Sequence, residues 1–192
     1  MATGVDEFRE LIKELTKVSA WVLPTAGISP VVTSLVGLNP PWPQKLPVTV
    51  ATSMTVLVTL VAIFQFMNGR SKRQVDRLMA ASLVLGLAAA TCYFILFALL
   101  VYSTPVTGEA FAKGFQCTNE ARQLFGVRCP WLDLDELKSA EYEATRLWTL
   151  PSIIASRLSL LFSWFATFGV FSVYLGAFLR HQSLRRRRAV PT

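Results

Sequence analysis

Long stretches without Asp, Glu, Lys or Arg dominate the hydrophobic pattern of the chain. They are Val18–Gln44, Leu46–Gly69, Leu78–Gly108 and Leu158–Leu179. A helix of about 18 or more apolar residues can cross the hydrocarbon core of a bilayer. The pattern therefore predicts transmembrane helices over 48–67, 79–102 and 158–179, the last of them within the segment 156–180.

The stretch 18–38 is a candidate for a fourth span. It is uncharged but contains Pro24, Gly27, Pro30 and Gly37, which membrane helices tolerate when neighbouring groups satisfy the freed carbonyls. The alternative is a re-entrant or interfacial segment. With this span, the cytoplasmic segments carry twelve Lys and Arg and the outer ones seven, whereas without it the numbers are nine and ten. Because Lys and Arg concentrate on the cytoplasmic side, four spans fit better.

Composition and charge support a membrane location. The hydrophobic fraction is 53% and the charged fraction only 16%, whereas roughly a quarter of the residues of a soluble domain are charged. The net charge of +7 does not indicate nucleic-acid binding, because the bases flank the predicted spans. We expect the segments 68–78 and 181–192 to face the cytoplasm and lipid headgroups, through Arg70, Lys72, Arg73, Arg77, Arg185, Arg186, Arg187 and Arg188.

The segment 1–17 is predicted to be an amphipathic helix. Phe8, Leu11, Ile12 and Leu15 recur at a spacing of three or four residues, as on one face of a helix. Several acidic residues and the lack of a basic start argue against a signal peptide. Both termini are then cytoplasmic in an integral protein of the plasma or inner membrane.

The segment 103–155 is the one sizeable polar part of the sequence. It contains Cys117 and Cys129, and on the non-cytoplasmic side such a pair forms a disulfide if the compartment is oxidising. The alternative is two free thiols. Helical spacing after Asp133 predicts a small helical cap of two short helices outside the membrane. Pro151 suits the first turn of the last helix, which we expect to run past Arg180.

Several aromatic side chains give this cap an apolar surface. This surface can pack on the membrane helices or serve as a docking face for a partner. The residues concerned are Phe111, Phe115, Phe125, Trp131 and Trp148.

Small residues recur at helical spacing on two of the predicted spans. Such faces let helices approach closely, either within one chain or between chains. The predicted helix-packing residues are Gly86 and Ala90 on one span and Ala166, Gly169, Ser172 and Gly176 on the last.

The sequence contains no recognisable catalytic constellation. Nucleophile-elbow, zinc-protease and phosphate-loop patterns are absent, there is one histidine, and the predicted spans 48–67, 79–102 and 158–179 contain no ionisable acid or base. Charged groups inside spans are typical of proton relays and ion-coupled transporters. The overall prediction is thus an all-α, polytopic transmembrane helical bundle that has no enzymatic activity and needs no cofactor or metal.

Two functions fit this bundle. The first is a structural or partner-binding subunit whose partners are the bilayer and other membrane protein chains, with no nucleic acid. The alternative is an oligomeric pore, channel or membrane-permeabilising effector, in which the threonine-rich span 48–67 lines a path. A channel usually carries a charged or carbonyl-lined filter, and no span offers charged side chains for one.

Overall fold

The computed structural model describes residues 28–43, 45–67, 69–104, 108–140 and 142–189. The predicted helix 1–17 and most of the candidate span 18–38 lie outside these ranges. The chain divides into two compact units. The first comprises Met1–Asn39, Leu46–Ala90 and Phe165–Thr192, and the second comprises Pro40–Lys45 and Thr91–Trp164.

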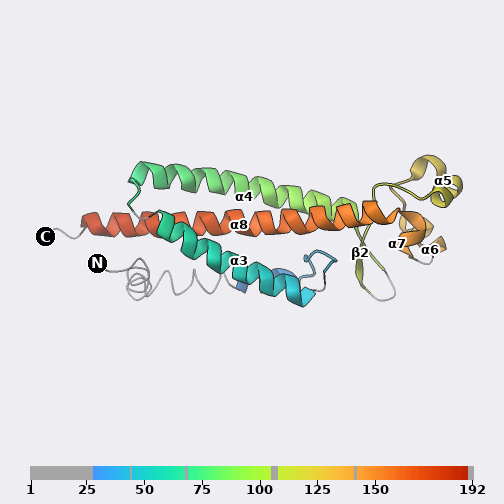
Figure 1. The fold of residues 1–192 in the computed structure, drawn as a ribbon, viewed down its shortest axis with the longest axis horizontal. Coiled ribbons are helices and arrows are strands. Elements are labelled where there is room, and N and C mark those ends of the chain that lie inside the picture. Colours follow the sequence, from blue (N-terminus) through green and yellow to red (C-terminus); the bar gives the residue numbers. More distant parts are fainter. Residues whose placement is uncertain (1–27, 44, 68, 105–107, 141, 190–192) are drawn as a thin grey trace. The chain divides into compact units, whose positions relative to one another are not determined.

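Three long helices make up most of the described chain (Figure 1). They are α3 (Lys45–Phe66), α4 (Lys72–Leu100) and α8 (Leu150–Ala189). Each contains a segment long and apolar enough to cross a membrane, namely Pro47–Phe66, Lys72–Leu100 and Leu150–Gln182. The three spans predicted from the uncharged stretches are confirmed as apolar helices.

The helices α4 and α8 extend beyond the uncharged stretches. The first turns of α4 include Lys72, Arg73 and Arg77, and α8 runs through 40 residues, about 60 Å at 1.5 Å per residue. The expectation of a last helix from about Pro151 to past Arg180 is confirmed. Charged residues with long side chains have good helix propensity, so a change from apolar to charged residues does not end a helix.

In the first unit, α8 packs against α3. Leu60 and Phe64 of α3 form a buried cluster with Leu179, and Leu175 packs on it. Residues 28–35 are also helical. Asn39, which follows them, donates from its side-chain amide to Ser34 Oγ at 2.9 Å and to Thr49 Oγ1 at 3.4 Å, and so ties this segment to the start of α3.

The second unit contains the cap, which is more varied than the predicted pair of helices. Its helical elements are α5 (Asn119–Phe125), the 3₁₀ turn η1 (Gly126–Arg128), α6 (Leu134–Ser139) and α7 (Ala144–Leu147).

An antiparallel hairpin in the second unit departs from the all-α prediction. The strands β1 (Val101–Ser103) and β2 (Ala110–Ala112) pair with Tyr102 opposite Phe111. The predicted span 79–102 is therefore too long, and α4 ends at Leu100. Gly108 has a positive φ of 67°, a conformation that glycine adopts without steric cost and that lets the chain turn back.

Candidate functional site

The cap is built around Trp148, which lies between α7 and α8 and is completely buried. Its indole nitrogen donates a hydrogen bond to the carbonyl of Pro130 at 3.2 Å. Leu132, Leu137 and Ile153 belong to the same buried cluster. A tryptophan whose polar atom is paired contributes a large apolar surface to such a core.

The predicted disulfide joins Cys117 and Cys129. The two residues are 12 positions apart, and their Cα atoms are separated by 6.3 Å, within the usual range for a disulfide. Cys117 also forms a β-bridge with Trp148. The disulfide closes the segment that holds α5 and η1, and the β-bridge of Cys117 joins this segment to Trp148 in the cap core.

The hydroxyl of Thr118 connects the start of α5 to α7. It accepts a hydrogen bond from the backbone nitrogen of Ala121 at 3.2 Å, as an N-cap does, and donates to the carbonyl of Arg146 at 2.7 Å. One side chain thus caps α5 and fixes its position in the cap.

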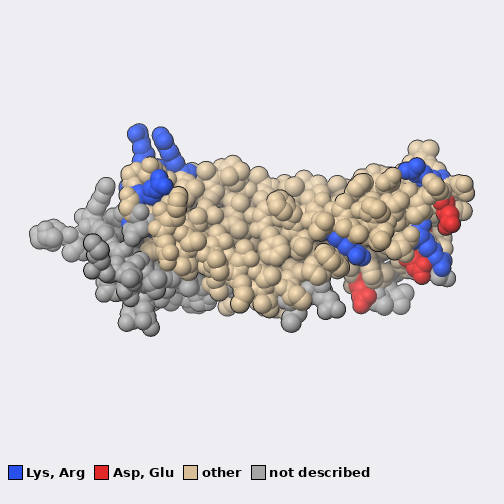
Figure 2. All heavy atoms as spheres, in the orientation of Figure 1, with Lys and Arg blue, Asp and Glu red and all other residues tan. Residues whose placement is uncertain are grey.

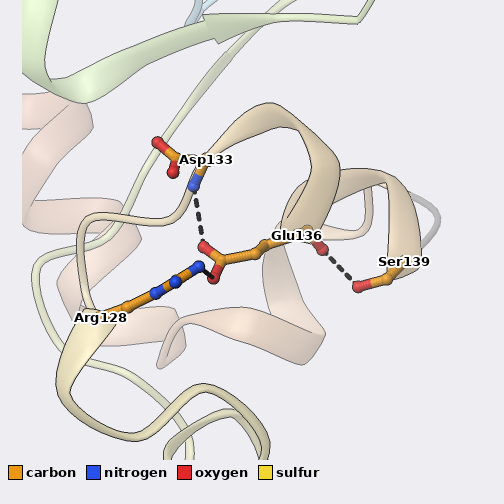
Figure 3. Close-up of polar contacts among 4 residues, drawn as sticks. All are labelled: Arg128, Asp133, Glu136 and Ser139. Carbon is orange, nitrogen blue, oxygen red and sulfur yellow. Dashed lines mark hydrogen bonds and ion pairs between the residues drawn. The ribbon is translucent and has the colours of Figure 1, made fainter.

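Glu136 organises the first turn of α6 (Figure 3). Its carboxylate accepts from the backbone nitrogen of Asp133 at 3.0 Å and lies 3.1 Å from Nη1 of Arg128. Both contacts stabilise the charged carboxylate, and they hold the pKa of Glu136 below its ordinary value of 4.5.

This lowered pKa predicts an acid-sensitive cap. The stabilisation is present above the ordinary pKa of 4.5 and is lost as pH falls through the lower folded-state value. We expect the protease resistance of the cap to fall on acidification, and Glu136→Gln to reduce this dependence. Glu120→Gln, on exposed α5, is the control and keeps the wild-type profile. Identical profiles for wild type and Glu136→Gln would contradict the prediction.

The aromatic residues of the cap separate into two groups. Phe111 and Phe125 are half-buried against the core, whereas Phe115 and Trp131 are each 55% exposed. The structure adds two exposed side chains that the spacing of residues did not predict, Leu124 of α5 at 77% and the fully exposed Val127 of η1. We call Leu124, Val127 and Trp131 the apolar patch of the cap. Helical spacing predicts which residues share a face, but not which face remains uncovered.

The small residues of the last span do not all meet a neighbouring helix. A Cβ added to Gly176 would lie 3.0 Å from Cγ2 of Ile63 on α3, and one added to Gly86 would lie 3.6 Å from Cγ1 of Val170. At Gly169, no described residue beyond the adjoining turns of its own helix has an atom within 4 Å of the same position. Ser172 is buried and donates to the carbonyl of Phe168 at 2.7 Å, and Ala166 is half-buried. Close approach through a glycine is thus seen at Gly176.

Gly176 and Gly169 offer a matched pair of substitutions. We expect Gly176→Leu to destabilise the α3–α8 contact by about 1–3 kcal/mol, because the new side chain overlaps Ile63. Gly169→Leu replaces the same residue type on the same helix where no described side chain lies close to it, and we expect it to be neutral or stabilising. Thermal unfolding in detergent measures both, and equal effects would refute this assignment of the packing face.

Basic side chains gather where α4 begins (Figure 2). Arg70, Arg73 and Arg77 are exposed and Lys72 is half-buried, and the guanidinium of Arg70 lies 4.8 Å from the ring centroid of Phe66. This group, residues 70, 72, 73 and 77, is called the basic cluster below. The side chains of Arg185, Arg186, Arg187 and Arg188 lie outside the described part of the structure.

Two further charged residues join helices in the first unit. Asp76 on α4 contacts Nδ1 of His181 on α8 at 2.6 Å. Arg180 is buried, with its guanidinium 5.9 Å from the ring centroid of Phe64 on α3. In the sequence Arg180 marks only the end of a predicted span, whereas in the structure it packs against an aromatic ring.

Within the described ranges, no group of three or more His, Cys, Asp or Glu side chains is placed to hold a metal ion. Comparison with protein-family models gave no match, and neither did comparisons with curated proteins or with solved structures.

Proposed function

We propose that this chain is a non-catalytic integral membrane protein that serves as a partner-binding subunit of a membrane assembly. The observation that carries the proposal is the apolar patch of the cap. Leu124, Val127 and Trp131 are exposed on a structure held by a disulfide and a buried tryptophan. Exposed aromatic and aliphatic side chains on a rigid support are typical of protein-binding surfaces.

Three long apolar helices support insertion in a bilayer. The basic cluster at the start of α4 supports a cytoplasmic position for the α3–α4 connector. The disulfide supports a cap on the oxidising side of the plasma or inner membrane. Both termini are then cytoplasmic, with 18–38 as the fourth span.

The hydroxyl groups of α3 favour this function over a pore. Thr52 is buried and donates to the carbonyl of Val48 at 2.7 Å, and Thr55 donates to that of Ala51 at 2.8 Å. Both hydroxyls hydrogen-bond within their own helix, as packed membrane helices allow.

Orientation is tested at Ser71, which is exposed between α3 and α4. In a Cys92→Ala background, Ser71→Cys is expected to react with a membrane-impermeant maleimide in inverted vesicles and not in intact cells. Labelling from the outside alone would contradict the cytoplasmic connector.

Partner binding is tested by Leu124→Ser with Val127→Ser. Both side chains are exposed, so the cap is expected to stay within about 0.5 kcal/mol of wild-type stability. Membrane protein chains that co-purify with the detergent-extracted wild type are expected to bind the double variant at least about tenfold more weakly. Gln123→Ser, on the same helix, is the control. Unchanged co-purification, or a closed homo-oligomer that leaks ions in liposomes, would refute the proposal.

A further inference from the structure

A cavity of about 280 Å³ opens on the first unit, between the helical residues 28–35, α4 and α8. Its walls are almost entirely apolar. The apolar residues that line it are Leu83, Gly86, Leu87 and Ala90 of α4 and Phe168 and Phe171 of α8. Leu87 is 63% exposed and Phe171 44%, so the cavity is a groove that opens on the surface of the helices.

The lining of the groove restricts what it can bind. Among the described residues, no charged side chain lines it. Ser82 is buried and donates to the carbonyl of Met79 at 3.1 Å, so its hydroxyl is satisfied within its own helix. Apolar cavities exclude water, and drug-sized ligands need pockets of about 300–1,000 Å³. A single alkyl chain fits the size and chemistry of this groove.

The basic cluster lies on the same helix, toward its N-terminus. Lys72, Arg73 and Arg77 belong to the first two turns of α4, and residue 73 precedes residue 83 by about 15 Å along the helix axis. The carboxylate of Asp76 contacts His181 at 2.6 Å, which engages the one acid of these turns. Figure 2 shows Lys and Arg without a visible acid at this end of α4. The separation suits a phosphate at the basic cluster and an acyl chain that reaches the groove.

We propose that the groove and the basic cluster form a binding site for one anionic phospholipid. Its acyl chain lies against Gly86 and Ala90. Its phosphate pairs with Lys72, which is 18 residues before Ala90 and so on the same face of α4, and with the neighbouring Arg73. The site rests on the proposed membrane insertion but not on partner binding by the cap. It goes beyond general attraction to an anionic surface, because the chain and the headgroup are held by different residues.

Native mass spectrometry of the delipidated, detergent-extracted chain tests this site. The probes are dioleoylphosphatidylglycerol, which is anionic, and dioleoylphosphatidylcholine, which is zwitterionic. We expect one phosphatidylglycerol per chain, bound more tightly than phosphatidylcholine. Lys72→Gln with Arg73→Gln is expected to weaken phosphatidylglycerol binding about fivefold for each base removed and to leave phosphatidylcholine unchanged. Arg122→Gln in the cap is the matched charge control.

The groove is tested separately by filling it. We expect Ala90→Phe to weaken the binding of both lipids about tenfold, which corresponds to two methylene groups left unburied. Gly86→Leu is a second filling variant in case Ala90→Phe does not fold. Leu85→Phe is the control, because Leu85 is exposed on α4 and does not line the groove.

The outcomes separate this site from its alternatives. Binding that depends on the bases but not on the filling variants would overturn the proposal in favour of a charged surface alone. Competition by glycerophosphate, which has no acyl chain, would do the same. Equal binding of the two lipids by the wild type would also refute it. A chain that needs no detergent would refute the membrane insertion itself, whereas loss of partner binding by the cap variants leaves the lipid site untouched.

Discussion

Trp148→Ala is expected to unfold the cap while the long helices remain. The side chain is fully buried, its ring centroid lies 6.1 Å from that of Tyr102, and its indole nitrogen pairs with Pro130. Truncation of a buried tryptophan costs about 3–5 kcal/mol, and here it also removes one of the two hydrogen bonds that the Pro130 carbonyl accepts, since the backbone nitrogen of Leu132 still donates to it. We expect near-UV circular dichroism from the cap to collapse and trypsin to cleave at Arg128 and Lys138.

Trp131→Ala is the matched control for this substitution. Trp131 belongs to the same cap but is 55% exposed, so its loss is expected to change stability by less than about 1 kcal/mol. The same substitution removes part of the apolar patch and is expected to weaken partner binding. Equal protease sensitivity of the two variants would show that Trp148 is not the centre of the cap core.

Gly114→Ala is a second substitution that tests the packing around Trp148. Gly114 is buried, and an added Cβ would lie 2.6 Å from Cβ of Trp148. Because backbone and tryptophan must shift to admit it, we expect a loss of stability of about 1–3 kcal/mol. The tight packing of Trp148 thus requires a residue without a side chain at position 114.

The three long helices could be predicted from the sequence because run length alone identifies them. Uncharged stretches longer than a bilayer is thick have few alternatives to a helix, since every backbone polar group is then paired within the segment. The ends of these helices could not be predicted in the same way. Lys72 and Arg73 continue α4, and Val101 and Tyr102, although apolar, leave it for a strand.

In the cap, residue type alone does not predict which side chains are buried. The two cysteines predict a disulfide because a pair on an oxidising side has few other uses. Trp131 and Trp148 are the same residue type in the same segment, yet one is exposed and the other buried. Burial there depends on Tyr102 of β1, Leu137 of α6 and Ile153 of α8, which come from three separate parts of the chain. No local pattern brings these together.

The spacing of small residues on α8 likewise does not predict which of them contacts another helix. Gly169 and Gly176 share the helical spacing that predicted a packing face, but only Gly176 meets α3 at close range. Spacing fixes the angular position of a residue on its own helix. The crossing point of a second helix depends on side chains of that second helix, such as Ile63 on α3, which lie more than a hundred residues away in the sequence.

Removal of the disulfide is expected to weaken the cap by about 3 kcal/mol, because the bridge closes a loop of 12 residues and restricts the unfolded chain. Cys117→Ala with Cys129→Ala is the suitable variant. Alanine leaves no hydroxyl in the buried position of Cys117. The expected result is faster proteolysis of the cap and a thermal transition of the cap at lower temperature.

Cys92→Ala is the control, since Cys92 is the free cysteine and its loss leaves the bridge intact. Dithiothreitol is expected to bring the wild type and Cys92→Ala to the proteolysis rate of the double variant, and to leave the double variant unchanged. If the reductant alters neither the gel mobility nor the proteolysis of the wild type, the two cysteines are free thiols. In that case no bond in the cap favours an oxidising compartment, and the orientation then rests on the distribution of Lys and Arg between the two sides of the membrane.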